Sequence, residues 1–222
     1  GGDAADAKAE VNSVDGLVSL GGDVIDVSSD AGIQGLASID LASAAESTGG
    51  ADPTKATATS TAGTLQGAEL NSLTDIGGVG SVAGSTDLSS SAAASNVTGG
   101  AFATGTLTSA EGLDLNATLD VASDASVSGT ASINSSADAA TTAGKADADA
   151  TSTTITGADL AGGIVDVGGI GSIAGQANFG LSATSSNVSQ TSEADAGSTT
   201  ATGLIGKATN FTTNPETFGI DV

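Results

Sequence analysis

Apolar and polar side chains alternate with a period of two residues along short segments of this chain. Leu113, Leu115, Leu119 and Val121 are separated by polar or small neighbours. Successive side chains of a β-strand point to opposite faces of a sheet, so this alternation is typical of strands. Pairs of adjacent glycines punctuate the segments and supply the backbone freedom that turns need. The pattern therefore predicts an all-β protein.

The chain contains an internal duplication. The segment 75–84 (DIGGVGSVAG) reappears as 166–175 (DVGGIGSIAG), 91 residues later. Such self-similarity indicates a repeated structural unit. An Asp followed by a β-branched residue also recurs at intervals of 49, 45 and 46 residues, at Asp26, Asp75, Asp120 and Asp166. The sequence thus predicts four related modules of about 46 residues.

Two architectures suit modules made of short strands and glycine turns. One is a tandem of antiparallel β-sandwich-like modules, and the other is a β-solenoid. Apolar residues cluster near the start of each module, whereas a solenoid with short coils would distribute them along the whole chain. We therefore predict tandemly duplicated antiparallel β-sandwich-like modules, with a β-solenoid as the alternative. The predicted divisions are an N-terminal extension (1–15), two β repeats (16–111 and 112–207) and a C-terminal tail (208–222).

The tail departs from the repeat and is rich in large apolar side chains. Phe218, Ile220 and Val222 lie on one side of a period-two segment, and Phe211 precedes them. One copy can add an apolar strand to an open sheet edge of its neighbour. These four residues are therefore candidate assembly residues, and the alternative is that the strand completes its own sheet.

Composition excludes several classes of function. The chain has 26 acidic residues against 4 basic ones and a net charge of −22, so it cannot neutralise phosphates or adhere to anionic lipid. No apolar run is long enough for a membrane span. The absence of His and Cys removes the commonest general base and the thiolate nucleophile. With only 2% aromatic residues for a substrate platform, we expect no enzyme.

Calcium is the candidate cofactor that the sequence suggests. Aspartate oxygens are preferred calcium ligands, and the four repeated residues Asp26, Asp75, Asp120 and Asp166 are the candidate ligands. Ser81 and Ser172 stand where the glycine-rich calcium-binding β-roll pattern would need an Asp. The alternative is that each Asp caps a turn or faces solvent.

Five Asn-x-Ser/Thr sequons are candidate glycosylation sites, although Ser and Thr are abundant enough to create such sequons by chance. The five are Asn96, Asn116, Asn134, Asn187 and Asn210.

Threonine-rich runs close the modules. In the run Thr57, Thr59 and Thr61, alternate hydroxyls would lie on one face of a strand, as a flat ice-binding surface requires. No regular coil spacing between the Thr pairs is evident, and Thr is also simply a favourable strand residue. Ice binding is therefore an alternative and not the leading hypothesis.

The blocks 75–88 and 166–178, centred on Gly-Ser-Val/Ile-Ala-Gly, resemble repetitive Ala/Gly/Ser/Asp-rich extracellular filament or surface proteins of marine bacteria, including cyanobacteria. The resemblance is compositional, covers most of the chain and transfers no functional residue. It implies an extracellular location and self-assembly. The lack of an initial Met also leads us to expect a secreted chain from which a signal peptide has been removed.

The leading hypothesis is a structural subunit that self-assembles as a homopolymer into an extracellular fibre, sheath or surface layer, with strand exchange between subunits as the mode of assembly. One alternative is a β-solenoid adhesin or ice-binding module. A second alternative is an acidic calcium-binding surface protein.

Overall fold

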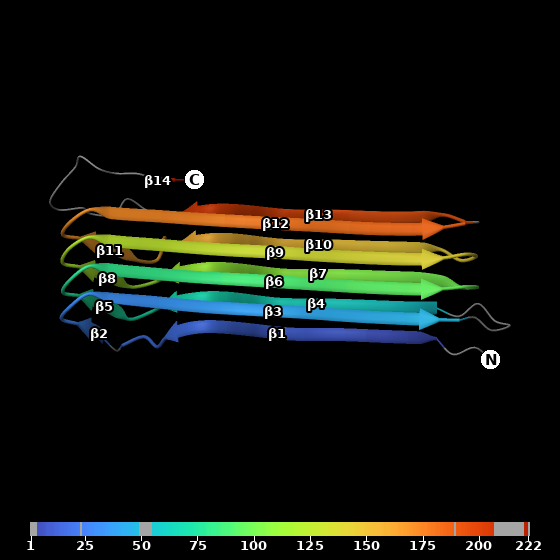
Figure 1. The fold of residues 1–222 in the computed structure, drawn as a ribbon, viewed down its shortest axis with the longest axis horizontal. Helices are drawn as coiled ribbons and strands as arrows, with labels where there is room; N and C mark the ends of the chain where they lie inside the picture. The colour runs from blue at the N-terminus through green and yellow to red at the C-terminus, as the bar shows by residue number, and fades with distance from the viewer. Residues whose placement is uncertain (1–3, 23, 49–54, 189, 207–219, 222) are drawn as a thin grey trace.

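The computed structural model describes residues 4–22, 24–48, 55–188, 190–206 and 220–221. The described chain is built from strands that run side by side along the long axis of the molecule (Figure 1). The strands are β1 (Ala5–Ser19), β2 (Val24–Val27), β3 (Ala31–Ser47), β4 (Lys55–Leu70), β5 (Leu73–Ile76), β6 (Gly80–Asn96), β7 (Gly100–Leu115), β8 (Thr118–Val121), β9 (Ala125–Thr141), β10 (Ala146–Asp159), β11 (Ile164–Val167), β12 (Gly171–Asn187), β13 (Ser192–Ile205) and β14 (Ile220–Asp221).

The strands form three sheets, and every neighbouring pair is parallel. Sheet A has the order β1-β4-β7-β10-β13, sheet B has the order β11-β8-β5-β2, and sheet C has the order β14-β12-β9-β6-β3. The chain follows a long strand of sheet A, a short strand of sheet B and a long returning strand of sheet C, then begins the next coil. Sheets A and C pack face to face, as the contacts of β1 with β3 and of β4 with β6 show. The fold is a parallel β-solenoid with wide, flattened coils.

The prediction of antiparallel sandwich-like modules is wrong, and the solenoid given as the alternative fits the structure. Coils were expected to be short, but successive coils are 51, 45 and 45 residues apart, as the pairs Ala5–Ala56, Ala56–Ala101 and Ala101–Ala146 show. One 46-residue module is therefore one coil. The clustering of apolar residues once per module is what a solenoid of this width produces. The predicted divisions at 15/16 and 111/112 fall inside β1 and β7.

The core between sheets A and C is thick at one end and thin at the other. Near sheet B it contains large side chains such as Leu70, Leu115 and Val121. Its middle contains Leu65, Leu88 and other large residues. At the far end the buried side chains of the cluster are all alanines. Because a methyl group fills so little space, the two sheets can approach each other closely there.

Two stacked rows of glycine bring the backbones of sheets A and C together between the thick end and the middle of the core. The row of sheet A contains Gly16, Gly67, Gly112, Gly157 and Gly203, and the row of sheet C contains Gly35, Gly84, Gly129 and Gly175. A Cβ atom on Gly112 would lie 2.6 Å from the backbone oxygen of Thr130, and one on Gly67 would lie 2.6 Å from that of Ser85. These positions have no room for a side chain, so each coil carries a glycine there.

The buried inner columns also contain hydroxyl groups. Ser90 Oγ donates a hydrogen bond to Ser60 Oγ across the two sheets at 2.8 Å. Within the described residues, the buried hydroxyls of Ser43, Thr86 and Ser135 have no hydrogen-bond partner. An unpaired buried hydroxyl costs free energy. These side chains are small enough to fit in the core, but their hydroxyls lower the stability of the fold.

The turns between sheets B and C alternate between two designs. The amide of Val79 donates to Asp30 Oδ1 in the preceding coil at 2.8 Å, and the amide of Ile170 donates in the same way to Asp124 Oδ1 at 2.8 Å. The coils that donate carry Gly-Gly before the apolar residue, and a Cβ on Gly78 would lie 2.6 Å from the nitrogen of Asp30. This alternation gives the duplication of 91 residues its physical basis, because the repeating unit of the turns is two coils.

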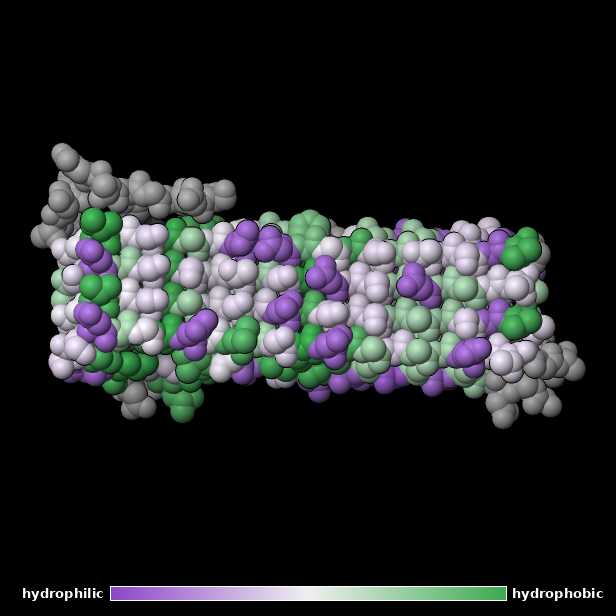
Figure 2. All heavy atoms as spheres, viewed as in Figure 1, coloured by the Kyte–Doolittle hydropathy of each residue, from purple (hydrophilic) through white to green (hydrophobic). Residues whose placement is uncertain are grey.

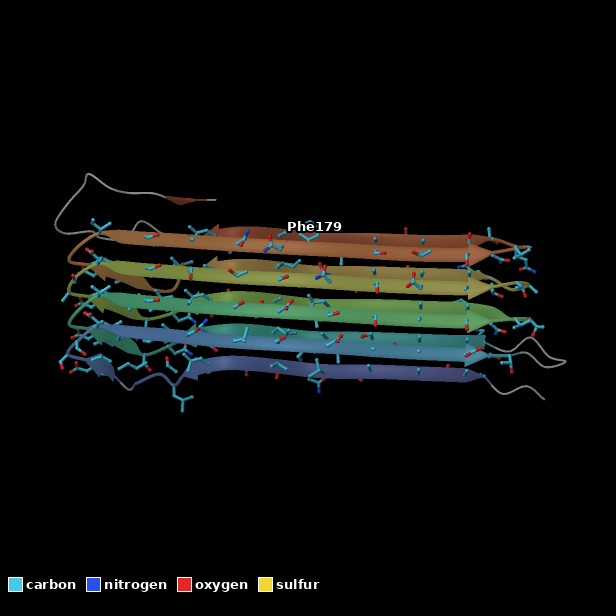
Figure 3. The ribbon with its side chains drawn as sticks, viewed as in Figure 1. Phe179 is labelled. Atoms are coloured by element: carbon cyan, nitrogen blue, oxygen red, sulfur yellow. The ribbon has the colours of Figure 1, made fainter. Side chains whose placement is uncertain are left out.

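Phe179 of β12 marks the last long strand of sheet C (Figure 3). It continues the inner column of Ile39, Leu88 and Ile133, and it pairs in register with Ile133. Its side chain is 53% exposed. In the described residues, only the two-residue strand β14 pairs with the outer edge of β12. The exposure of Phe179 follows from its place on the last long strand.

Replacing Gly112 with Ala tests the close approach of the sheets. The added methyl would overlap the backbone of β9, so we expect Gly112→Ala to lower the free energy of unfolding by about 3 kcal/mol or more. Gly32→Ala is the matched control, because a Cβ on Gly32 meets no atom within 4 Å. Urea unfolding followed by circular dichroism measures both variants. Equal midpoints for the two would contradict the glycine argument.

Candidate functional site

The outer face of sheet A carries a continuous patch of hydroxyl side chains in its central strands. Parallel pairing places Thr61 beside Thr106, Thr106 beside Thr151, and Thr59 beside Thr104. These side chains alternate with buried residues and point away from the core. We call the patch the threonine field, and it consists of Thr59, Thr61, Thr64, Thr104, Thr106, Thr108, Ser109, Thr151, Thr153 and Thr154.

The threonine field is a two-dimensional grid. Neighbouring strands lie about 4.8 Å apart, and alternate residues of one strand lie about 6.6 Å apart. Threonine is branched at Cβ and has few χ1 rotamers, so the positions of its hydroxyl and methyl groups are restricted. Ser109 Oγ donates a hydrogen bond to Thr64 Oγ1 of the neighbouring coil at 3.3 Å, which ties one column together. The face therefore presents ordered hydroxyl and methyl groups.

A bulge repeated in each coil widens the field. The pairing of β4, β7 and β10 passes over Gly63, Thr108 and Thr153, so each strand turns two successive residues outward at this point. Thr108 and Ser109 are both at least partly exposed, whereas Leu107 and Ala110 on either side of them are buried. Because the bulges stack from coil to coil, they do not disturb the register of the sheet.

Charged side chains border the field at both ends. On one side lie Asp147 and Asp149, with Lys145 Nζ 2.8 Å from Asp147 Oδ2. The Nζ of Lys55 lies 5.5 Å from the centre of the Phe102 ring on the same side. This border contains both signs of charge, in contrast to the opposite border.

The opposite border is a cluster of carboxylates from neighbouring strands. Burial, followed by the charges of Asp114, Asp159 and Glu69, raises the pKa of Glu111 to about 7. Burial also raises the pKa of Asp114, although hydrogen bonds from Asn116 (2.9 Å) and Gln66 (3.5 Å) oppose the rise. Carboxylates stacked in one sheet repel each other, so some of them hold protons more tightly than free side chains do.

The four predicted calcium ligands form one column. Asp26, Asp75, Asp120 and Asp166 pair in register along sheet B and alternate with its inward-facing residues. Burial and the charges of Asp75 and Asp166 raise the pKa of Asp120. In the part of the chain that the structure describes, no group of three or more acidic side chains has an arrangement that could hold a metal ion. Calcium binding at this column stays a prediction.

The predicted sequons lie in different environments. Asn96 is only 4% exposed, and its side chain both accepts and donates hydrogen bonds within its turn. Asn187 makes a similar turn, Asn116 bonds to neighbouring side chains, and Asn134 lies on the outer face of β9. Asn210 lies outside the described residues. Glycosylation stays untested, and the burial of Asn96 leaves little space for a glycan there.

Only one of the candidate assembly residues lies in the described chain. Ile220 belongs to β14 and pairs in parallel with Ile173 of β12 in the same molecule. Phe211, Phe218 and Val222 lie outside the described residues. Exchange of the tail between subunits therefore stays a prediction.

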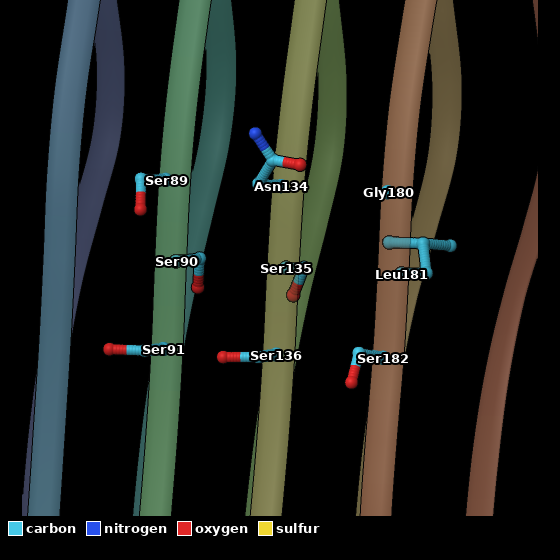
Figure 4. A pocket seen from close by; sticks show the side chains of 9 residues that line it. All are labelled: Ser89, Ser90, Ser91, Asn134, Ser135, Ser136, Gly180, Leu181 and Ser182. Atoms are coloured by element: carbon cyan, nitrogen blue, oxygen red, sulfur yellow. The ribbon is translucent and has the colours of Figure 1, made fainter.

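Sheet C offers a shallow depression on its outer face (Figure 4). Its volume is about 300 Å³, and it is lined mostly by serines, together with Asn134 and Leu181. Ser89, Ser91, Asn134, Ser136 and Ser182 surround it on β6, β9 and β12. Its lining contains serine hydroxyls and one amide, and no Asp, Glu or Lys belongs to it.

The spacing of threonines along the sequence contains a signal for the threonine field that the Thr-rich runs alone do not give. Thr61, Thr106 and Thr151 are spaced by 45 residues, as are Thr108 and Thr153. This spacing equals the length of the coils that contain them. The expectation that the Thr pairs lack a regular coil spacing is therefore wrong, because it assumed a much shorter coil.

Comparison of the chain with protein-family models, with curated proteins and with solved structures gives no match in any of the three. Among the described residues, no helix has the length and apolar character needed to cross a membrane.

The raised pKa of Glu111 makes a pH-dependent contribution to stability. The folded protein holds this proton up to a pH of about 7, whereas the ordinary value for the unfolded chain is 4.5. Between these values the folded state binds more protons, so its stability falls as the pH rises. We expect Glu111→Gln to raise the melting temperature at pH 8 and to leave it nearly unchanged at pH 4.

Thermal unfolding of the Glu111→Gln variant at both pH values measures this effect. Asp87→Asn, on the outer face of sheet C, is the control for removing one negative charge. If the two variants gave the same gain at pH 8, the effect would come from net charge and not from the cluster around Glu111.

Proposed function

We propose that the protein binds ice through the threonine field on the outer face of sheet A. The observation that carries this proposal is the parallel register that brings Thr residues of three successive coils side by side. Each Thr offers a hydroxyl, which exchanges hydrogen bonds with water, and a methyl group, around which water forms ordered cages. The roughly 4.8 Å separation of the strands is close to the spacing of repeated oxygen atoms in hexagonal ice.

The rigidity of the face supports the same function. Both neighbours of β7 are long paired strands, and the backbone beneath the field belongs to a continuous hydrogen-bonded ladder. A surface that is already ordered loses little conformational entropy when it binds. Many weak contacts with lattice water can then add to a useful affinity. Binding to a solid surface requires a flat protein face and no deep pocket, and the molecule meets this requirement.

The charge on the rest of the surface favours a protein that stays in solution. The chain carries a net charge of −22, and repulsion between copies opposes non-specific association of their outer faces. The ten residues of the field carry no charge, and charged side chains lie at its margins, where Asp149 pairs with Thr104, and Lys8 and Glu10 pair with Thr59 and Thr61. Water over the grid can therefore be arranged by hydroxyl and methyl groups without strongly hydrated ions among them.

A lysine at the centre of the grid tests the proposal. Thr106 has field residues on both neighbouring strands, so the long charged side chain of Thr106→Lys would hold a flat ice surface away. We expect the concentration that halts ice recrystallisation to rise by about tenfold, which corresponds to about 1.4 kcal/mol of binding free energy. Thr130→Lys is the matched control, because Thr130 occupies an outward position of β9 on the opposite face.

Two results would contradict the proposal. One is a wild-type protein that is excluded from a slowly growing ice hemisphere and has no effect on recrystallisation. The other is a Thr130→Lys variant that loses activity while Thr106→Lys keeps it, since the active surface would then be sheet C. Circular dichroism of both variants would show that each keeps its strands.

A further inference from the structure

One carboxyl group interrupts a column of neutral side chains beside the threonine field. Glu111 of β7 pairs with Gln66 of β4 on one side and with Thr156 of β10 on the other. Ser109, which belongs to the threonine field, is the outward-facing residue next to Glu111 on the same strand, about 6.6 Å away along it. The protonation state of this one carboxyl group therefore decides whether the column carries a charge on these three strands.

The two protonation states of Glu111 present different groups to water. An ionised carboxylate only accepts hydrogen bonds, whereas a protonated carboxyl group has an O–H donor and an acceptor, like the hydroxyl of Thr. Removing water from an ionised carboxylate also costs much more free energy than removing it from the neutral form. The protonated column therefore offers water the same kinds of groups as the threonine field, and the ionised column does not.

We propose that the protonation of Glu111 sets the width of the ice-binding face. With a proton on the carboxyl group, the uncharged area extends from the threonine field over Gln66, Glu111 and Thr156. With the carboxyl group ionised, the uncharged area ends at the column that contains Ser109. This inference rests on the proposed ice binding, and it adds a response to pH to that function.

The acids that surround Glu111 come from three strands. Glu69 of β4 pairs with Asp114 of β7, and Asp114 pairs with Asp159 of β10. These three residues form the next outward-facing column beyond Glu111, on the side away from the threonine field. Their negative charges oppose the ionisation of Glu111.

The lysines that the structure describes all lie toward the other end of sheet A. Lys55 is the first residue of β4, Lys145 immediately precedes β10, and Lys8 lies near the start of β1. Asp15 of β1 is the other acid in the column of Glu111, and it lies two strands away. Among the described residues, Glu111 therefore faces acids and neutral groups and no base.

These surroundings bring the titration of Glu111 close to neutral pH. Burial, followed by the charges of Asp114, Asp159 and Glu69, raises the pKa of Glu111 to about 7. Its carboxyl group is therefore mostly protonated below this pH and mostly ionised above it. We expect a wider uncharged face in mildly acidic solution than in alkaline solution.

A second acid with a raised pKa borders the threonine field on its other side. Asp149 pairs with Thr104. Burial, followed by the charges of Asp147, Asp195 and Glu193, raises the pKa of Asp149, although the charge of Lys145 opposes the rise. A test of Glu111 must therefore separate its titration from that of Asp149.

Sheet C provides acids that lie apart from one another. Asp40, Asp87 and Asp138 occupy three different columns of its outer face. Figure 2 shows hydrophilic side chains scattered over this face of the molecule. Asp87 pairs with the neutral residues Ser38 and Ser132. Asp87 is therefore a suitable control for the removal of one acid away from sheet A.

Two substitutions in the column of Glu111 test the proposal. Glu111→Gln removes the charge at every pH and nearly keeps the shape, whereas Gln66→Glu adds a second acid beside the first. The measurement is the concentration that halts ice recrystallisation at pH 5.5 and at pH 8. We expect the wild type to need about threefold less protein at pH 5.5 than at pH 8. Glu111→Gln should need that lower concentration at both pH values, and Gln66→Glu should need more than the wild type at pH 8.

The controls are Asp149→Asn and Asp87→Asn, and both should keep the pH response of the wild type. The inference is overturned if the wild type is equally active at both pH values, if Glu111→Gln keeps the pH response, or if Asp149→Asn abolishes it. Each of these results leaves the proposed ice binding standing. A wild type that is inactive at both pH values overturns the ice binding and this inference together. Circular dichroism at both pH values confirms that every variant keeps its strands.

Discussion

The in-register parallel ladder is the constraint on which the rest of this structure depends. In a central long strand, each residue pairs with one residue about one coil earlier in the sequence and with another about one coil later. A side chain must therefore pack against the residues at the same position in the two neighbouring coils as well as against its own coil. Gly67, Gly112 and Gly157 stack for this reason, because a single larger residue in that column would displace the sheet opposite. The same rule that removes side chains inside the molecule produces ordered columns of Thr and Asp outside it.

The coils are not identical, and their differences follow a two-coil period. Leu17, Ala68, Leu113, Ala158 and Leu204 occupy one inner column, in which large and small residues alternate. In a closely packed core, a bulky side chain in one coil is accommodated by a small one above and below it. The turns alternate for a related reason, since the carboxylate of Asp30 or Asp124 occupies space that only a glycine in the next coil leaves open. The packing of the core and the structure of the turns therefore both repeat every two coils.

The sequence was sufficient for the strand content and for the length of the repeat, but not for the direction of pairing. Alternation along Leu113 to Val121 indicates a strand whether its neighbour is parallel or antiparallel, because both kinds of sheet have a period of two. The decisive fact was that a whole 46-residue module forms one coil, and this fact depends on contacts between residues far apart in the chain. The 45-residue spacing of Thr61 and Thr106 gained its meaning only with the length of the coil, because the two residues become neighbours when the coil closes. The column of repeated Asp residues was visible in sequence because an Asp before a β-branched residue recurs at each equivalent position.

Like charges within a column cost stability, and their distribution shows where the fold tolerates that cost. In sheet B, Asp residues stack in all four coils, and burial together with the charges of Asp75 and Asp166 raises the pKa of Asp120 between them. In sheet A, Glu69, Asp114 and Asp159 form another column of acids, and Glu111 lies near it in a column between the neutral Gln66 and Thr156. The acidic columns of both sheets thus lie on outer faces, and the row of Thr61, Thr106 and Thr151 between those of sheet A carries no charge.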